Sequence, residues 1–275
     1  MCFPTKNKPL TAAFLISIIS MNLSSCGKDV PSGGRLPAQD IYIPATEGNS
    51  NPYGFWFWSD GTTLWIVRDD VGDDTIYAYT LATGARNAAK DINTLGAAGN
   101  TSPRGLWSDG TTLWVSDWSD DKIYAYTLAN GTRNAAKDIN TLRTVGNTSP
   151  RGLWSDGTTL WVSDWSDDKI YAYTLANGTR NAAKAINNLN SDNDNPQGLW
   201  SDGTTLWVAN NDFSGSNDKI YAYTLATGAR NTARDINTLN AADNNSPEGL
   251  WSDGTTLWVS NNRFDNNKIY AYQLK

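Results

Sequence analysis

The residues best suited to bind a ligand occupy loops that differ between otherwise similar segments of the chain. Aromatic side chains stand among Asp, Asn, Ser and Gly in four of these loops: Trp118, Trp165, Phe213 and Phe264. A second set varies in type and precedes a glycine each time: Tyr53, Arg104, Arg151, Gln197 and Glu248. Aromatic rings suit the apolar face of a sugar and polar groups suit its hydroxyls. Together the two sets predict a site for a glycan or a protein ligand.

Carboxylates cluster in the same loops and offer a second kind of chemistry. They are Asp117, Asp120, Asp121, Asp164, Asp167 and Asp168. Hard oxygen donors of this kind could bind calcium. No copy has the twelve-residue calcium loop with its closing Glu, so we favour solvated loop acids and predict no cofactor, with calcium as the alternative.

Composition excludes several functions. The chain of 275 residues contains no histidine, which removes Ser-His and Cys-His nucleophile pairs and imidazole metal ligands. Its net charge of −6 argues against a nucleic-acid partner, because phosphate binding needs clustered Lys or Arg. Catalysis needs one unique constellation, whereas nearly every acid here recurs by repetition. The sequence therefore predicts a protein that is not an enzyme.

A repeated motif positions these loops. W-S-D-G-T-T-L-W begins at Trp58, Trp107, Trp154, Trp200 and Trp251, and its aspartates are 46 to 51 residues apart. Such a period indicates a propeller, an array or a solenoid. Asp-Gly between apolar segments is a strong hairpin signal, so the aspartates are predicted to form turns and not a catalytic site. The recurring tryptophans are predicted to pack in the core.

Each repeat provides four candidate strands. In the second repeat these are residues 105–107, 111–116, 123–128 and 136–142, the last being the most polar. Four strands per repeat form the blade of a propeller. The last repeat stops after its third strand at residues 268–274, and residues 39–43 resemble the missing fourth. The chain is thus predicted to be all-β: a monomeric five-bladed β-propeller over 39–275 with four antiparallel strands per blade, in which residues 39–43 complete the last blade and close the ring.

The unit SPRGLWSDGTTLWVSDWSDDKIYAY resembles the repeat of NHL-type propellers. That family includes enzymes, protein binders and RNA binders, so the resemblance implies a fold and not a function. The alternative function is a metal-dependent hydrolase of the gluconolactonase type. Such an enzyme would need an asymmetric central cluster of Glu, Asn and Asp, whereas the varying positions before the glycines include two arginines and one acid.

The N-terminal segment carries the features of an export signal. Lys6 and Lys8 precede an apolar stretch at 10–21, which is typical of a signal peptide. Leu23-Ser24-Ser25-Cys26 resembles the lipobox of bacterial lipoproteins, which implies cleavage of residues 1–25 and lipidation of Cys26. Residues 26–38 are predicted to be a flexible tether. The resemblance places the protein in the bacterial cell envelope, on the outer membrane, through this lipid anchor alone.

Overall fold

The computed structural model describes residues 30–43, 55–68, 74–212, 218–239, 244–261 and 268–274. The predicted signal peptide and Cys26 lie outside them. In the described ranges the regular elements are β-strands and single turns of 3-10 helix. None of these helical turns is long and apolar enough to cross a membrane.

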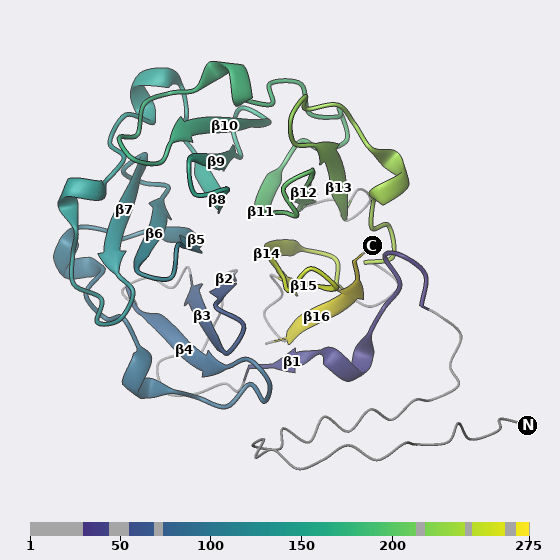
Figure 1. Cartoon of the computed structure of the whole chain (residues 1–275), viewed down its shortest axis with the longest axis horizontal. Coiled ribbons are helices and arrows are strands. Elements are labelled where there is room, and N and C mark those ends of the chain that lie inside the picture. Colours follow the sequence, from purple (N-terminus) through teal and green to yellow (C-terminus); the bar gives the residue numbers. More distant parts are fainter. Residues whose placement is uncertain are drawn as a thin grey trace, which may run out of the picture.

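The strands of the described residues form five antiparallel sheets (Figure 1). Strand order is β2-β3-β4, β5-β6-β7, β8-β9-β10, β11-β12-β13 and β14-β15-β16-β1. The bounds are β1 (Ile41–Tyr42), β2 (Phe55–Ser59), β3 (Thr63–Arg68), β4 (Ile76–Thr80), β5 (Pro103–Ser108), β6 (Thr112–Asp117), β7 (Lys122–Thr127), β8 (Pro150–Ser155), β9 (Thr159–Asp164), β10 (Lys169–Thr174), β11 (Pro196–Ser201), β12 (Thr205–Asn210), β13 (Lys219–Thr224), β14 (Pro247–Ser252), β15 (Thr256–Asn261) and β16 (Lys268–Gln273). The 3-10 turns are η1 (Pro37–Gln39), η2 (Ala88–Lys90), η3 (Gly96–Ala98), η4 (Ala135–Lys137), η5 (Arg143–Val145), η6 (Ala182–Lys184) and η7 (Thr232–Arg234).

The sheets are arranged around a central axis, as in a β-propeller (Figure 1). The first strand of each sheet lies nearest the centre, and neighbouring inner strands contact one another in the cyclic order β2, β5, β8, β11 and β14. Each sheet is a meander, so its two hairpin connections lie at opposite ends. The Asp-Gly turns are therefore at one end of the molecule, and the aromatic and acidic loops are at the other.

The predicted fourth strand is not continuous in four of the sheets. In the sheet β5-β6-β7 the outer segment makes two isolated bridges, Tyr126 with Arg133 and Ile123 with Ile139. Between them the chain folds into the 3-10 turn η4. The same pair of bridges recurs outside β4, β10 and β13. The short turn interrupts the ladder because its backbone groups bond locally, so the expected strand at 136–142 is reduced to the bridge at Ile139.

The aspartates of the repeated motif form turns, as predicted. In the second repeat, Asp109 Oδ1 accepts hydrogen bonds from Thr111 N, Thr111 Oγ1 and Thr112 N at 2.7–2.8 Å, and Gly110 has φ +90°. Burial alone would raise the pKa of Asp109, but these hydrogen bonds outweigh it and lower the pKa. The same contacts recur at Asp60, Asp156, Asp202 and Asp253.

Paired tryptophans lie on neighbouring strands next to these turns. The rings of Trp107 and Trp114 face each other across β5 and β6 with centroids 5.2 Å apart. Equivalent pairs in the other sheets have centroids 5.2–5.4 Å apart. Trp114 is buried and joins a cluster that includes Leu153 and Tyr171 of the next sheet. The tryptophans thus pack in the core, as predicted, and they make contacts both within their own sheet and with the next sheet.

The two ends of the described chain meet in one sheet. Strand β1 pairs antiparallel with β16, Ile41 opposite Ile269, and Arg35 bridges to Tyr272. The N-terminal segment thus supplies the outer strand that the last repeat lacks, as its sequence predicts. This pairing joins the last sheet to a segment that precedes the first sheet in the chain.

An Arg–Asp pair fastens the outer segment in four sheets. The pairs are Arg35–Asp40, Arg86–Asp91, Arg133–Asp138 and Arg230–Asp235. Each aspartate also accepts a hydrogen bond from a backbone amide of the neighbouring strand, as Asp138 does from Ala125 N at 3.0 Å. In the remaining sheet Ala185 takes the place of the aspartate, and Arg180 donates to the carbonyl of Ala172 at 3.0 Å.

Replacing Ala185 with Asp should therefore stabilise the protein. The new carboxylate would pair with Arg180 and accept from Ala172 N, as its counterparts do, and raise the free energy of unfolding by about 1–2 kcal/mol. Urea denaturation followed by circular dichroism measures this. Ala185→Asn is the matched control, since an amide can accept from Ala172 N without carrying charge. An aspartate variant no more stable than the Asn variant would contradict the expectation.

Candidate functional site at the mouth of the ring

The inner strands approach one another through glycine. A Cβ placed on Gly105 would lie 2.2 Å from the carbonyl oxygen of Arg151, and one on Gly152 would lie 2.4 Å from that of Gln197. Serine side chains of the middle strands add hydrogen bonds between sheets: Ser116 Oγ donates to Arg151 O at 2.6 Å. These contacts bring the residue before each glycine to the axis.

Four of the five predicted positions before a glycine lie within the described residues, and we call the end of the axis that they surround the mouth: Arg104, Arg151, Gln197 and Glu248. Gly105, Gly152 and Gly198 approach the backbone of the next inner strand in this way, whereas a Cβ on Gly249 would lie 2.8 Å from the ring of Phe57. Arg104, Gln197 and Glu248 are each only 4% exposed, and Arg151 is half-buried. Buried polar side chains need hydrogen-bond partners, and Arg104 Nη1 donates to the carbonyl of Pro103 at 3.2 Å. Tyr53 lies outside the described residues.

The fifth axial position is held by Phe55, which the sequence did not single out. Ser260 Oγ donates to Phe55 O at 2.7 Å, as Ser163 Oγ donates to Gln197 O at 2.5 Å. The first repeat has two additional residues, and β2 pairs with β3 without the irregularity that interrupts the pairing of the other inner strands. The doubled Phe-Trp of this repeat is the sequence signal that could have pointed to Phe55.

The loop tryptophans and the mouth arginines form one alternating series. The guanidinium carbon of Arg104 lies 5.0 Å from the ring centroid of Trp56 and 5.6 Å from that of Trp118. The guanidinium carbon of Arg151 lies 5.4 Å from the centroid of Trp118 and 5.5 Å from that of Trp165. Such contacts are worth roughly 0.5–2 kcal/mol each. We call these five residues the mouth ladder; it joins two predicted aromatics to two predicted polar positions.

Backbone bonds hold the ladder's loops in place. Trp118 N donates to Ser102 O at 3.3 Å, and Trp165 N donates to Ser149 O at 3.1 Å. Each bond joins the loop that follows the middle strand of a sheet to the connection that precedes the inner strand of that sheet. Trp118 is nevertheless 41% exposed, and Trp165 is half-buried. The ladder thus presents aromatic surface to solvent.

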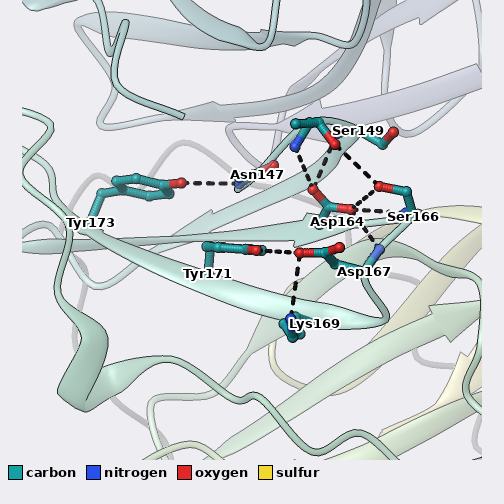
Figure 2. Close-up of polar contacts among 9 residues, drawn as sticks. Asn147, Ser149, Asp164, Ser166, Asp167, Lys169, Tyr171 and Tyr173 are labelled. Carbon is teal, nitrogen blue, oxygen red and sulfur yellow. Dashed lines mark hydrogen bonds and ion pairs between the residues drawn. The ribbon is translucent and has the colours of Figure 1, made fainter. Parts of the chain in front are cut away.

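Buried aspartates organise the same loops, as Figure 2 shows for the third repeat. Asp164 Oδ2 accepts from the amides of Thr148 and Ser149 at 2.8 and 3.1 Å. Asp164 Oδ1 accepts from Ser166 N, Ser166 Oγ and Asp167 N at 2.8–2.9 Å. Asp117 makes the equivalent five bonds in the second repeat.

Asp117 and Asp164 are therefore not the solvated loop acids that the sequence suggested: both are 0% exposed. Each carboxylate can be buried because five neighbouring donors in its loop take the place of water. Asp120 and Asp167 have another structural role, accepting from the hydroxyls of Tyr124 and Tyr171. Burial and this bond to Asp167 raise the pKa of Tyr171 (Figure 2).

Asp121 and Asp168 close the loops with φ +53°, a left-handed conformation that Asp tolerates better than most residues. Burial, followed by the nearby charge of Asp164, raises the pKa of Asp121 even though Arg143 lies 3.6 Å away. Hydrogen bonds and ion pairs already occupy most of the oxygens that calcium would need. Among the described residues no group of three acids, histidines or cysteines is arranged to hold a metal ion.

Two predicted aromatics, Phe213 and Phe264, lie outside the described residues. In the corresponding sheets, the position of Asp117 is taken by Asn210 and Asn261. Asn210 Oδ1 accepts from Asn195 N at 2.9 Å, so an amide can organise the entering connection as the carboxylate does. The structure thus brings together Trp118, Trp165, Arg104 and Arg151.

No protein-family model matches the chain, and no curated protein matches its sequence. Solved structures do match. Glutaminyl cyclase from Myxococcus xanthus is 12% identical with a TM-score of 0.59, over 87% of this chain and 96% of that one. A chain of a nidogen/laminin complex is 19% identical with a TM-score of 0.55, over 83% and 78%. A protein proposed to be a 6-phosphogluconolactonase, from Bacteroides uniformis, is 17% identical with a TM-score of 0.50, over 85% and 70%. At these identities the likeness shows the fold alone: the chain is a β-propeller.

Proposed function

We propose that this protein is a non-catalytic binding module of the bacterial cell envelope. In this proposal a five-bladed β-propeller, anchored through a lipid on Cys26, presents the mouth ladder to a glycan. The observation that supports it is the exposure of Trp118, a large aromatic side chain held between two arginines at the mouth. A sugar ring can stack on indole while its hydroxyl or carboxylate groups bond to a guanidinium.

The rival function is a metal-dependent hydrolase. Two of the matching structures carry enzyme names, a cyclase and a proposed lactonase. The described axial positions do not fit a divalent ion, because Arg104 and Arg151 bring positive charge to the ring that would hold it. Glu248 is the acid of that set, and Phe55 provides a hydrocarbon side chain.

Removing both loop tryptophans should weaken glycan binding. The variant Trp118→Ala/Trp165→Ala deletes the exposed platform and two of the five ladder residues, so we expect affinity for a captured glycan to fall at least roughly tenfold. Glycan-array screening of residues 27–275, followed by calorimetry with the glycan captured, measures this loss. The array should include neutral and acidic sugars, since the arginines favour a carboxylate.

Tyr42→Ala provides the matched control. Tyr42 is 68% exposed on the outermost strand of its sheet, so its removal deletes an exposed aromatic without touching the mouth. The proposal fails if the double variant binds as the parent does while remaining folded. Capture of a protein in place of any glycan would assign the mouth to a protein partner. Turnover of a lactone that a chelator stops would establish the hydrolase.

A further inference from the structure

A basic side chain covers the core tryptophan in four of the five sheets. The charged groups of Lys90, Lys137, Lys184 and Arg234 lie 5.4–5.8 Å from the ring centroids of Trp65, Trp114, Trp161 and Trp207. The three lysines also donate from Nζ to a threonine hydroxyl at 2.7–2.8 Å. Each cation belongs to the 3-10 turn of the outer segment of its own sheet.

The same cation lies close to the aspartate of the Asp-Gly turn. Lys184 Nζ is 3.8 Å from Asp156 Oδ2, and Arg234 Nη1 is 3.3 Å from Asp202 Oδ2. In the other two sheets the charges of Lys90 and Lys137 help to lower the pKa of Asp60 and of Asp109. The repeated arrangement is thus a cation between an indole face and a carboxylate. Both partners favour a positive charge at this position.

The sheet β14-β15-β16-β1, which we call the closing sheet, has the indole and the carboxylate but not the cation. Gln39 takes the position of the lysine: its Oε1 accepts from Thr256 Oγ1 at 2.8 Å, and its carbonyl accepts from Trp258 Nε1 at 3.1 Å. The latter bond matches that from Trp161 Nε1 to Lys184 O. Gln39 therefore reproduces the backbone placement and the threonine contact, but it is shorter and uncharged. Trp258 is 8% exposed, whereas its four counterparts are 1–3% exposed.

A cavity of about 360 Å³ opens at this place. Its lining includes Gln39, Asp253 and Trp258 from the closing sheet, and Leu81 and Ala82 from the first sheet. Asp253 Oδ1 accepts the turn's hydrogen bonds, from Thr255 N, Thr255 Oγ1 and Thr256 N. Within the described ranges Asp253 forms no ion pair with a Lys or Arg. The cavity thus combines an aromatic ring, a carboxylate and apolar walls.

We propose that this cavity binds a primary alkylammonium group. The ammonium lies over Trp258 beside Asp253, where four other sheets place their own cation, and the alkyl chain lies against Leu81 and Ala82. The cavity is at the Asp-Gly end of the sheets, opposite the mouth ladder. This site is therefore independent of the proposed glycan function.

Two reciprocal variants test the assignment. Gln39→Lys gives the closing sheet the residue of its neighbours and should fill the site from within. Lys137→Gln gives the second sheet the residue of the closing one and should open an equivalent site. Because each substitution installs a residue that this fold already holds at that position, both variants are expected to fold.

The probe is n-butylammonium, with 1-butanol as its neutral analogue, in an NMR titration that follows the tryptophan indole N–H signals of the 15N-labelled protein. We expect n-butylammonium to shift the signal of Trp258 in the parent chain, to leave it unmoved in Gln39→Lys, and to shift the signal of Trp114 as well in Lys137→Gln. The alcohol should shift neither signal.

Equal shifts of the Trp258 signal in the parent and in Gln39→Lys would overturn the proposal. So would shifts by 1-butanol as large as those by n-butylammonium, since the site would then be apolar only. An unmoved Trp258 signal at saturating probe would also overturn it. Glycan binding at the mouth should be unchanged in both variants, which separates this test from that of the proposed function.

Discussion

Replacing Gly152 with alanine is expected to destabilise the propeller severely. The added Cβ would lie 2.4 Å from the carbonyl oxygen of Gln197 and 2.7 Å from the Cα of Gly198. Both neighbours are backbone atoms of the next inner strand, so no side chain can rotate away. We expect a loss of roughly 3 kcal/mol in the free energy of unfolding, enough to lower the yield of folded protein. Urea denaturation followed by tryptophan fluorescence measures it.

Gly110→Ala is the control for this prediction. Gly110 has φ +90° in an exposed turn, and a Cβ there would meet nothing within 4 Å. Its replacement should cost only the strain of a left-handed backbone, roughly 1–2 kcal/mol. If the two variants were equally stable, the close approach of the inner strands would not be what makes Gly152 necessary.

Replacing Asp40 with alanine should have the second large effect. Asp40 accepts from both terminal nitrogens of Arg35 and from Ala271 N, and it lies 2.6 Å from Lys268 Nζ. Burial would raise the pKa of Asp40, but hydrogen bonds from Arg35 and Lys268 outweigh it and lower the pKa. Its removal leaves two cations and an amide without their acceptor where β1 meets β16. We expect a loss of roughly 3 kcal/mol.

Asp91→Ala is the matched comparison, because Asp91 pairs with Arg86 and accepts from Ala78 N at 2.9 Å in an ordinary sheet. Among the described residues it has one cationic partner, and it does not join the two ends of the described chain. Thermal denaturation should therefore show a smaller fall in Tm for Asp91→Ala than for Asp40→Ala. A fall of the same size in both would mean that the closing sheet gains nothing from its additional lysine.

The features that recur in every repeat could be predicted from the sequence. Asp109 and its counterparts form the expected turns because Asp-Gly encodes them locally. The outer segment did not become the expected strand, since the alternation at 136–142 does not reveal that residues 135–137 prefer a 3-10 turn. Alternation indicates a strand, whereas the pairing that forms also depends on which backbone groups bond locally, as those of Lys137 and Asp138 do here.

The mouth was predicted in part. The approach of Trp118 to Arg104 follows from two loops meeting at one end of a sheet, which the meander dictates. The position of Phe55 could not be obtained from spacing, because it depends on whether the inner strand carries an irregularity in its pairing. The burial of Asp117 could not be predicted either. An acid in a polar loop is expected to be solvated, and only the structure shows the five donors that surround this carboxylate.

The close contact of the inner strands has a consequence for how this molecule can diverge. At Gly105, Gly152 and Gly198 the spacing between neighbouring sheets is limited by main-chain atoms that every sequence shares. A mutation at the mouth therefore changes the chemistry of one loop without changing the spacing between these inner strands. The repeats can therefore differ in their mouth residues one position at a time while the architecture stays fixed.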